Sequence, residues 1–220
     1  MPLSSRALRV GLVATSIAGC SDVVSTAPTR GPGLEPLLSA NSQSGLQLRI
    51  GSFGDGTKAA WKSGEGLIDA KGSRFQALLL QKATLTSTFS AAYAQLKGLE
   101  GLAPAALVRL RWEHRNDTHC GAGAPRWNIN ITGATGNSYT VFLGCSGSAQ
   151  SAGSAPNWTR DNWEAADIAA QILSQAGSDA ANGTIASIFI LFDEGNDAGS
   201  GFVFLDNITV NSKVFTSSSD

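Results

Sequence analysis

The acidic residues of this sequence gather in the stretch FDEGNDAGSGFVFLDNITVN, residues 192–211. Asp193, Glu194 and Asp197 lie in one glycine-rich loop, and Asp206 follows inside an apolar strand. Calcium takes roughly six to eight oxygen ligands and favours carboxylates, so the acids, Asp206 above all, are candidate calcium ligands, although their spacing is not that of an EF-hand. The alternative is that protein groups satisfy them, because a buried Asp206 needs a partner and Asp193 is an ordinary turn former.

Catalytic arrangements find little support in the sequence. A carboxylate pair such as Glu113 and Glu194 would suit glycoside hydrolysis. A Ser-His-Asp triad would need one of two histidines, but His114 falls on the apolar face of a predicted strand and His119 stands beside a cysteine. Both settings favour structural roles. We therefore expect no enzymatic activity and keep a glycan-active hydrolase as the weakest of three alternatives.

Two kinds of side chain are candidates for binding a carbohydrate. Flat aromatic rings stack on sugars, and Trp61 and Trp158 fall in polar segments predicted to be loops. Each either presents its ring to a polysaccharide or folds back onto the core. Arg109 and Arg111 belong to a charged row in the stretch 108–115, which either faces an acidic glycan or forms a solvated sheet face.

The N-terminus indicates export. Two arginines precede the nine-residue apolar run VGLVATSIA, which is too short for a bilayer span of about 20 residues. The run ends in Ile17-Ala18-Gly19-Cys20, which resembles the bacterial lipobox. This resemblance implies a signal peptide over residues 1–19, lipidation of Cys20 and a membrane-anchored protein of the cell envelope, with Ser21 favouring the outer membrane. The alternative is an ordinary signal peptide and a secreted protein.

Once Cys20 is lipidated, Cys120 and Cys145 remain as an even pair. In an oxidising compartment such a pair normally forms a disulfide. Closing this loop would stabilise the fold by roughly 3–4 kcal/mol. A zinc site using His114, His119 and Cys120 is the alternative, but its spacing matches no common zinc pattern. The sequence therefore predicts the disulfide.

Composition places the chain among loop-rich β proteins. Of its 220 residues, 42% are apolar and 15% are charged, and the net charge is −1. The near-zero net charge argues against a nucleic-acid partner, because phosphates require a basic surface. Residues 20–44, rich in Pro, Ser, Thr and Gly, are predicted to be a flexible tether. From residue 45 to residue 220, short apolar runs alternate with Gly, Asn, Asp and Ser, which predicts one all-β domain, an antiparallel β-sandwich.

The strands are predicted from alternation. In the stretch 107–115, Val108, Leu110, Trp112 and His114 share one face, and the charged residues share the other. The stretch 184–192 is apolar on both faces and suits the middle of a sheet. In the stretch 201–210, one face is expected to carry Phe202, Phe204, Asp206, Ile208 and Val210.

One helix is predicted over residues 159–177, TRDNWEAADIAAQILSQAG. Thr159 or Asp161 is the expected N-cap, and Gly177 the expected end. Trp163, Ile168 and Ile172 form its apolar stripe.

The ending FDEG…GFVFLDNITV resembles the last two strands of jelly-roll β-sandwiches found in carbohydrate-binding modules and galactose-binding-like domains. The resemblance by motif covers about 25 residues and implies a fold more than a ligand. Several such modules hold a structural calcium ion through a carboxylate of the last strand, which by position implies Asp206 here. The expected function is a non-catalytic, envelope-anchored module that binds carbohydrate. An envelope structural or interaction protein without a small ligand is the alternative.

Overall fold

The computed structural model describes residues 45–68, 74–121, 123–218 and 220. The signal peptide, Cys20 and the tether predicted from the sequence lie outside these residues. The strands are β1 (Gln47–Phe53), β2 (Thr57–Ile68), β3 (Arg74–Lys82), β4 (Ala91–Lys97), β5 (Arg109–Arg115), β6 (Arg126–Thr132), β7 (Ser138–Gly144), β8 (Ala149–Ala152), β9 (Trp158–Glu164), β10 (Thr184–Phe192), β11 (Phe202–Val210) and β12 (Lys213–Phe215). One α-helix, α1 (Ala165–Ala181), and two 3₁₀ turns, η2 (Pro104–Ala106) and η3 (Cys145–Gly147), complete the described elements.

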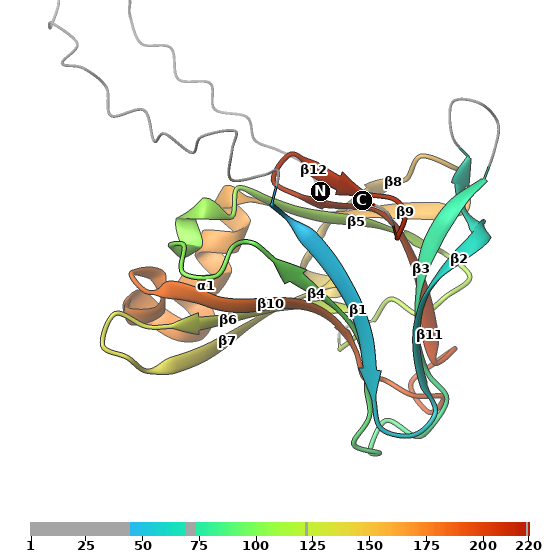
Figure 1. Ribbon diagram of the computed structural model, residues 1–220, viewed down its shortest axis with the longest axis horizontal. Helices are drawn as coiled ribbons and strands as arrows, with labels where there is room; N and C mark the ends of the chain where they lie inside the picture. The colour runs from blue at the N-terminus through green and yellow to red at the C-terminus, as the bar shows by residue number, and fades with distance from the viewer. Residues whose placement is uncertain (1–44, 69–73, 122, 219) are drawn as a thin grey trace, which may run out of the picture. The chain divides into compact units, whose positions relative to one another are not determined.

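The strands form two antiparallel sheets, as the sequence predicted (Figure 1). The five-stranded sheet has the order β1-β4-β10-β6-β7, and the seven-stranded sheet has the order β2-β3-β11-β5-β9-β8 with β12 beside β11. Within them, β3-β11-β5-β9 faces β4-β10-β6-β7. The first and last strands of this set of eight are neighbours in one sheet, which is the interleaved strand order of a jelly roll. The fold class is therefore confirmed as an all-β antiparallel sandwich with one short helix.

The main core fills the space between the two sheets. The predicted central strand β10 lies between β4 and β6, as its apolar sequence indicated. Three buried tryptophans dominate one part of this core: Trp112 stacks on Trp127 at 5.3 Å and meets Trp163 edge-on at 4.9 Å. Such aromatic contacts add roughly 0.5–1.5 kcal/mol each beyond the burial of their area. They fix β5, β6 and β9 relative to one another.

The helix begins later than predicted. Residues 158–164 form β9, which pairs with β5, and the helix starts at Ala165. In WTRDNWE, Asp161 and Trp163 point inward while Arg160 and Asn162 point outward, which is the period of a strand. Neither Thr159 nor Asp161 is the N-cap.

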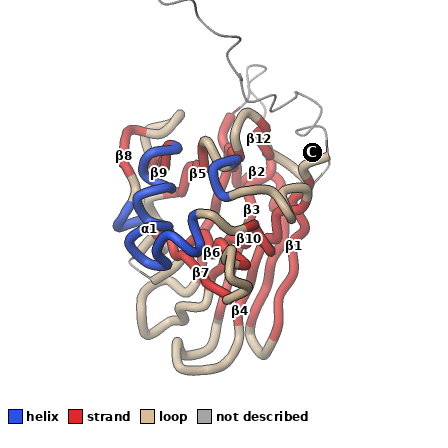
Figure 2. Tube along the Cα trace, turned by 90° about the vertical axis from the view of Figure 1, so that its left-hand side faces the viewer, coloured by secondary structure: helices blue, strands red, loops and turns tan. Residues whose placement is uncertain are grey.

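A backbone hydrogen bond from Glu164 N to Asp167 Oδ2 (3.0 Å) closes the start of the helix instead. Gly177 departs from helical geometry at φ 73° as expected of a helix end, but a further turn continues to Ala181. The helix packs beside β7 and β9, at the side of the sandwich opposite β1 (Figure 2).

A bulge changes the face that β11 presents to the core. Leu205 points inward, as do Ile208 and Val210, so inward residues are odd-numbered before the bulge and even-numbered after it. The pairing with β5 shifts between Asp206 and Thr209, and Asn207 has a positive φ of 46°. The prediction that Ile208 and Val210 share a face with Phe202, Phe204 and Asp206 is therefore wrong at both Ile208 and Val210.

The outer face of the seven-stranded sheet carries a second, smaller apolar cluster. Phe204 and Leu79 pair across β11 and β3 on this face, and Trp158 and Leu67 pack with them. Arg115 lies over the Phe204 ring at 4.2 Å. Near the other end of β5, Val108 is 40% exposed and precedes the strand, so its predicted place on the core face is wrong.

Cys120 and Cys145 are joined by a disulfide with their Cα atoms 5.8 Å apart, as predicted. Among the described residues, no helix combines the length and the apolar character that a membrane crossing requires.

Candidate functional site

An arginine groove, defined by Arg109, Arg111 and Arg160, crosses the outer face of the seven-stranded sheet. Arg109 and Arg111 extend from β5, Arg160 extends from β9, and the edge strand β8 forms one side. The hollow between them has a volume of roughly 330 Å³. Its remaining lining side chains are Ala149, Gln150, Ser151, Asn162 and Glu164. Three guanidinium groups therefore share one shallow surface with a single lining carboxylate.

Arg111 has the least complete set of partners in this groove. Its Nη2 donates to Thr209 Oγ1 at 3.2 Å, its buried Nε has no hydrogen-bond partner, and it forms no ion pair within the described chain. Burial first, and then the charges of Arg160 and Arg109, lower the pKa of Arg111, although Glu113 and Glu164 oppose the shift. A buried donor without an acceptor costs roughly 1–3 kcal/mol.

The two flanking arginines are paired with acids of the protein. Arg109 Nε donates to Glu164 Oε1 at 3.0 Å, and Arg160 Nη2 donates to Glu113 Oε1 at 2.8 Å. These pairs hold the guanidinium planes on either side of Arg111. Arg109 remains about half exposed, so it can also reach a bound ligand.

The sequence reasoning found two of the three arginines. Arg160 was assigned to the predicted helix, together with Asn162 and Glu164, which also line the groove. The signal that would have found it is the alternation of Arg160 and Asn162 with Asp161 and Trp163, which predicts a strand.

The two tryptophans proposed as sugar platforms do not lie in loops. Trp61 is in β2 and is half-buried against the main core, and Trp158 begins β9 and is 4% exposed. Both fold back onto apolar clusters, which was the alternative for each. Trp158 presents only an edge to a polar notch of roughly 230 Å³ beside Arg115 and Asp117.

Phe89 is the most exposed aromatic side chain of the described residues and was not predicted. It is 90% exposed, its ring lies 5.2 Å from that of Phe53, and both border a hollow of roughly 420 Å³ that Glu194 also lines. Residues of the β3–β4 connection and of the loop after β10 line this hollow, and both segments lie at the lower end of Figure 1. The exposure of Phe89 could not be predicted, because nothing in the loop sequence shows which aromatic side chain remains exposed to solvent.

The acids of the 193–197 loop each have a protein partner. Arg126 binds both carboxylate oxygens of Asp193 at 2.7 Å. Asp197 accepts hydrogen bonds from the backbone and side chain of Thr86, which lower its pKa. Glu194 hydrogen bonds to His119.

The positive charge beside this loop comes from Lys82, which is almost fully buried. Its ammonium group donates to the carbonyl oxygens of Thr86, Thr88 and Asp193 at 2.9, 2.6 and 2.8 Å. A lysine therefore occupies a cage of carbonyls of the kind that also coordinates cations.

Asp206 lies on the outer face, apart from this loop, and is 1% exposed. Leu67 N donates to its Oδ2 at 2.8 Å, and Asn207 N donates to its Oδ1 at 2.7 Å. Burial raises the pKa of Asp206 to about 6, against these two hydrogen bonds and with help from the charges of Glu113 and Asp220.

The donors around the predicted calcium ligands do not fit a calcium site. N–H groups point at both oxygens of Asp206, Arg126 occupies Asp193, and Thr86 occupies Asp197. Calcium needs oxygen ligands from the same directions. Binding of calcium at Asp206 stays a prediction, but these contacts satisfy the acids without an ion.

Glu113 departs from its predicted place on a solvated face, since it is 1% exposed. Burial alone would raise its pKa, but hydrogen bonds from Ser154 and Arg160 outweigh burial and lower it. Ser154 donates from both its backbone N (2.6 Å) and its hydroxyl (2.8 Å). Glu113 and Glu194, the pair considered for the hydrolase alternative, have separate partners, Arg160 and His119.

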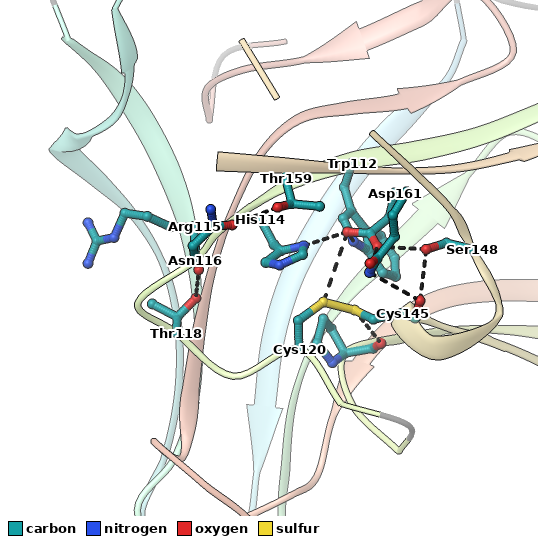
Figure 3. Close-up of polar contacts among 12 residues, drawn as sticks. Trp112, His114, Arg115, Asn116, Thr118, Cys120, Cys145, Ser148, Thr159 and Asp161 are labelled. Carbon is teal, nitrogen blue, oxygen red and sulfur yellow. Dashed lines mark hydrogen bonds and ion pairs between the residues drawn. A yellow bond between two sulfur atoms is a disulfide. The ribbon is translucent and has the colours of Figure 1, made fainter. Parts of the chain in front are cut away.

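A buried polar network lies on the core side of β9, below the arginine groove (Figure 3). Its centre is the fully buried Asp161, whose Oδ2 accepts from Trp112 Nε1 at 3.0 Å and bonds to His114 Nδ1. Its Oδ1 accepts from Ser148 Oγ (2.7 Å) and Gln150 Nε2 (3.0 Å). Gln150 also lines the groove, so it links the two sites.

This fold defines an all-β protein of the jelly-roll class with a polar, arginine-lined sheet face. No protein-family model matches the sequence, and no curated protein matches it significantly. Among solved structures, the chain is similar to a part of the β-1,2-glucanase from Parabacteroides distasonis, with a TM-score of 0.39 and 14% sequence identity. The match covers 76% of this chain and 22% of the glucanase, so the chain spans about a fifth of that enzyme's length. A likeness of this size carries no argument about function.

Proposed function

We propose that the protein is a non-catalytic carbohydrate-binding protein that holds an acidic glycan in the arginine groove. The observation that carries the proposal is Arg111: a guanidinium that forms no ion pair with the described residues, between two further arginines on an open surface. Carboxylate and sulfate groups match the planar fork of a guanidinium. The polar side chains of Asn162, Ser151 and Gln150 stand beside it for sugar hydroxyls.

The absence of a catalytic role belongs to the same proposal. The carboxylates nearest the groove are Glu113 and Glu164, and each holds an arginine. A glycosidase needs one carboxyl group that gives a proton and another that attacks or activates water. Both of these acids instead keep the arginines in place. Anchoring in the cell envelope through a lipidated Cys20 completes the proposal.

The test is binding of the full-length chain to polygalacturonate and to dextran sulfate, with neutral dextran as reference. We expect retention by the acidic polymers only. Arg111→Gln should weaken binding at least about tenfold, since a charge-assisted contact of this kind contributes on the order of 1.4 kcal/mol or more. Rising salt should weaken binding further.

The matched control is Arg49→Gln, which removes the same charge from β1, in the other sheet, where Arg49 is exposed. This variant should bind within about twofold of the parent. Equal losses of affinity in the two variants would show that binding depends on the net charge of the protein and not on the groove. Binding of neutral dextran as strongly as of the acidic polymers would overturn the proposal.

A second candidate function is an envelope interaction protein without a small ligand. The exposed Phe89 and its neighbour Phe53, which border one hollow, favour it, because aromatic side chains are enriched where proteins bind one another. If the acidic polymers do not bind, loss of a co-purifying envelope protein in Phe89→Ser would support this alternative.

A further inference from the structure

Four side chains of types that bind zinc meet in the buried network below the groove (Figure 3). They are His114, Cys120, Cys145 and Asp161, and one ligand atom from each lies within 4.8 Å of the others. His114 comes from β5, Asp161 from β9, and the cysteines come from the loop after β5 and the turn η3. Residues far apart in sequence are therefore held together by strand pairing and by the disulfide.

The surroundings of this cluster suit a metal centre. Asp161 is fully buried, and Cys145 and His114 are nearly so. Ser148 and Gln150 donate to Asp161 Oδ1, and Trp112 Nε1 donates to Oδ2, which lies 4.0 Å from Cys120 Sγ and also bonds to His114. Outer hydrogen bonds of this kind orient ligands in metal sites.

The spacing fits a tetrahedral zinc site after a small contraction. Zinc binds sulfur at about 2.3 Å and nitrogen or oxygen at about 2.0–2.2 Å, so its ligand atoms stand about 3.3–3.8 Å apart. The four candidate ligand atoms already lie within 4.8 Å of one another. Only the two sulfur atoms must separate, and Cα atoms 5.8 Å apart leave room for an ion between the side chains.

We propose that reduction of the Cys120–Cys145 disulfide opens a site for one zinc ion, bound by both thiolates, His114 and Asp161. A dithiol supplies the two electrons and two protons: its two S–H bonds break, it closes to its own disulfide, and the protein's S–S bond becomes two thiols. Zinc then replaces the two thiol protons, which leave to solvent. A ring nitrogen of His114 and the Asp161 carboxylate complete the four ligands.

In the proposed zinc form, the ion takes over the cross-link that the disulfide provides. The chain around η3, including Ser148 and Gln150, stays attached to β5 and β9 in either state. This inference is independent of the proposed glycan binding, since none of the four ligands lines the groove.

The experiment uses the full-length chain carrying Cys20→Ser, so that Cys120 and Cys145 are its only cysteines. It is reduced without oxygen by a water-soluble phosphine, which stands in for the dithiol and competes weakly for metal. Cobalt(II) is the probe, because thiolate ligands give it an intense charge-transfer absorption. We expect one cobalt ion per reduced chain, displaced by zinc, and no such absorption from the oxidised chain. Zinc should also raise the melting temperature of the reduced chain.

Variants separate this site from chance binding by free thiols. Cys145→Ser should lose the thiolate–cobalt absorption pattern of two sulfur ligands, and His114→Gln should weaken cobalt binding at least tenfold. His119→Gln, which changes the other histidine, should bind like the parent. Reduced protein that binds no cobalt, that gains no thermal stability from zinc, or that binds equally well as His114→Gln, would overturn the proposal.

Discussion

Asp161 and Asp206 are both buried aspartates on strands of the same sheet, yet their surroundings differ. Asp161 faces the main core and bonds to four side chains, Trp112, His114, Ser148 and Gln150. Asp206 faces outward beneath Leu67 and accepts from two backbone N–H groups, with Glu113 nearby. The pKa of Asp206 is raised to about 6.

The comparison shows that burial alone does not determine what a carboxylate does. A full set of side-chain donors compensates for lost water at Asp161. At Asp206 two donors do not offset burial and a neighbouring carboxylate, so the pKa of Asp206 is raised above its ordinary value. Glu113 differs from Asp206, because hydrogen bonds from Ser154 and Arg160 lower its pKa despite burial.

The largest effect is expected at the inner aspartate. Asp161→Ala removes the partner of four side chains, two of them buried, and should lower the free energy of unfolding by about 3–5 kcal/mol, measured by urea denaturation. Asp117→Ala is the control, because the Asp117 side chain is 65% exposed and pairs with Arg115 at the surface. It should cost less than about 1 kcal/mol. Similar losses in both would contradict the comparison.

The next effect is a pH dependence that belongs to the outer aspartate. Between the ordinary pKa of 3.8 and the folded value of about 6, the folded state holds a proton that the unfolded state has released. Stability from this group is therefore complete below the ordinary pKa and is lost as the pH rises through about 6. At about 1.4 kcal/mol per pKa unit, the loss is about 3 kcal/mol.

Asp206→Asn, which cannot titrate, should remove this part of the pH profile. The measurement is urea unfolding of parent and variant from about pH 4 to about pH 7. Parallel profiles would show that Asp206 does not titrate in this window. Adding calcium and then a chelator to the same samples tests the calcium prediction, since a calcium-dependent gain that Asp206→Asn abolishes would restore that site.

The smallest of the three effects is expected for Glu113→Gln. The substitution leaves Arg160 without its carboxylate and should cost about 1–2 kcal/mol in the free energy of unfolding. It also removes a negative charge that raises the pKa of Asp206. The pH-dependent loss assigned to Asp206 should therefore move to lower pH in this variant. An unchanged pH window would show that the two carboxylates do not interact.

Much of the fold could be predicted from local patterns. Alternation identified the faces of β5 through Leu110, Trp112 and His114, and the apolar stretch 184–192 was rightly placed in the middle of a sheet. The disulfide followed from counting cysteines. These features depend on the alternation of apolar and polar residues and on the number of cysteines, both of which can be read directly from the sequence.

The groove and the buried network could not be predicted in the same way. Arg160 and Asp161 were assigned to a helix, because apolar residues at helical spacing follow directly after them. Pairing with β5 outweighed that local preference. The bulge at Asn207 was also missed, since a single left-handed residue leaves no trace in the hydrophobic pattern.

Because of the bulge at Asn207, β11 contributes side chains both to the main core and to the small apolar cluster on the outer face. Before the bulge, Phe204 packs in the small apolar cluster on the outer face of the sheet. Without the bulge, regular alternation would place Ile208 on that outer face instead of in the main core. Deleting Asn207 would restore perfect alternation to the sequence. A regular strand that kept Asn207 without the bulge would instead turn Ile208 and Val210 toward the arginines and Thr209 into the core. With the bulge, β11 places apolar side chains in the main core along its whole length and keeps Thr209 on the outer face beside Arg111.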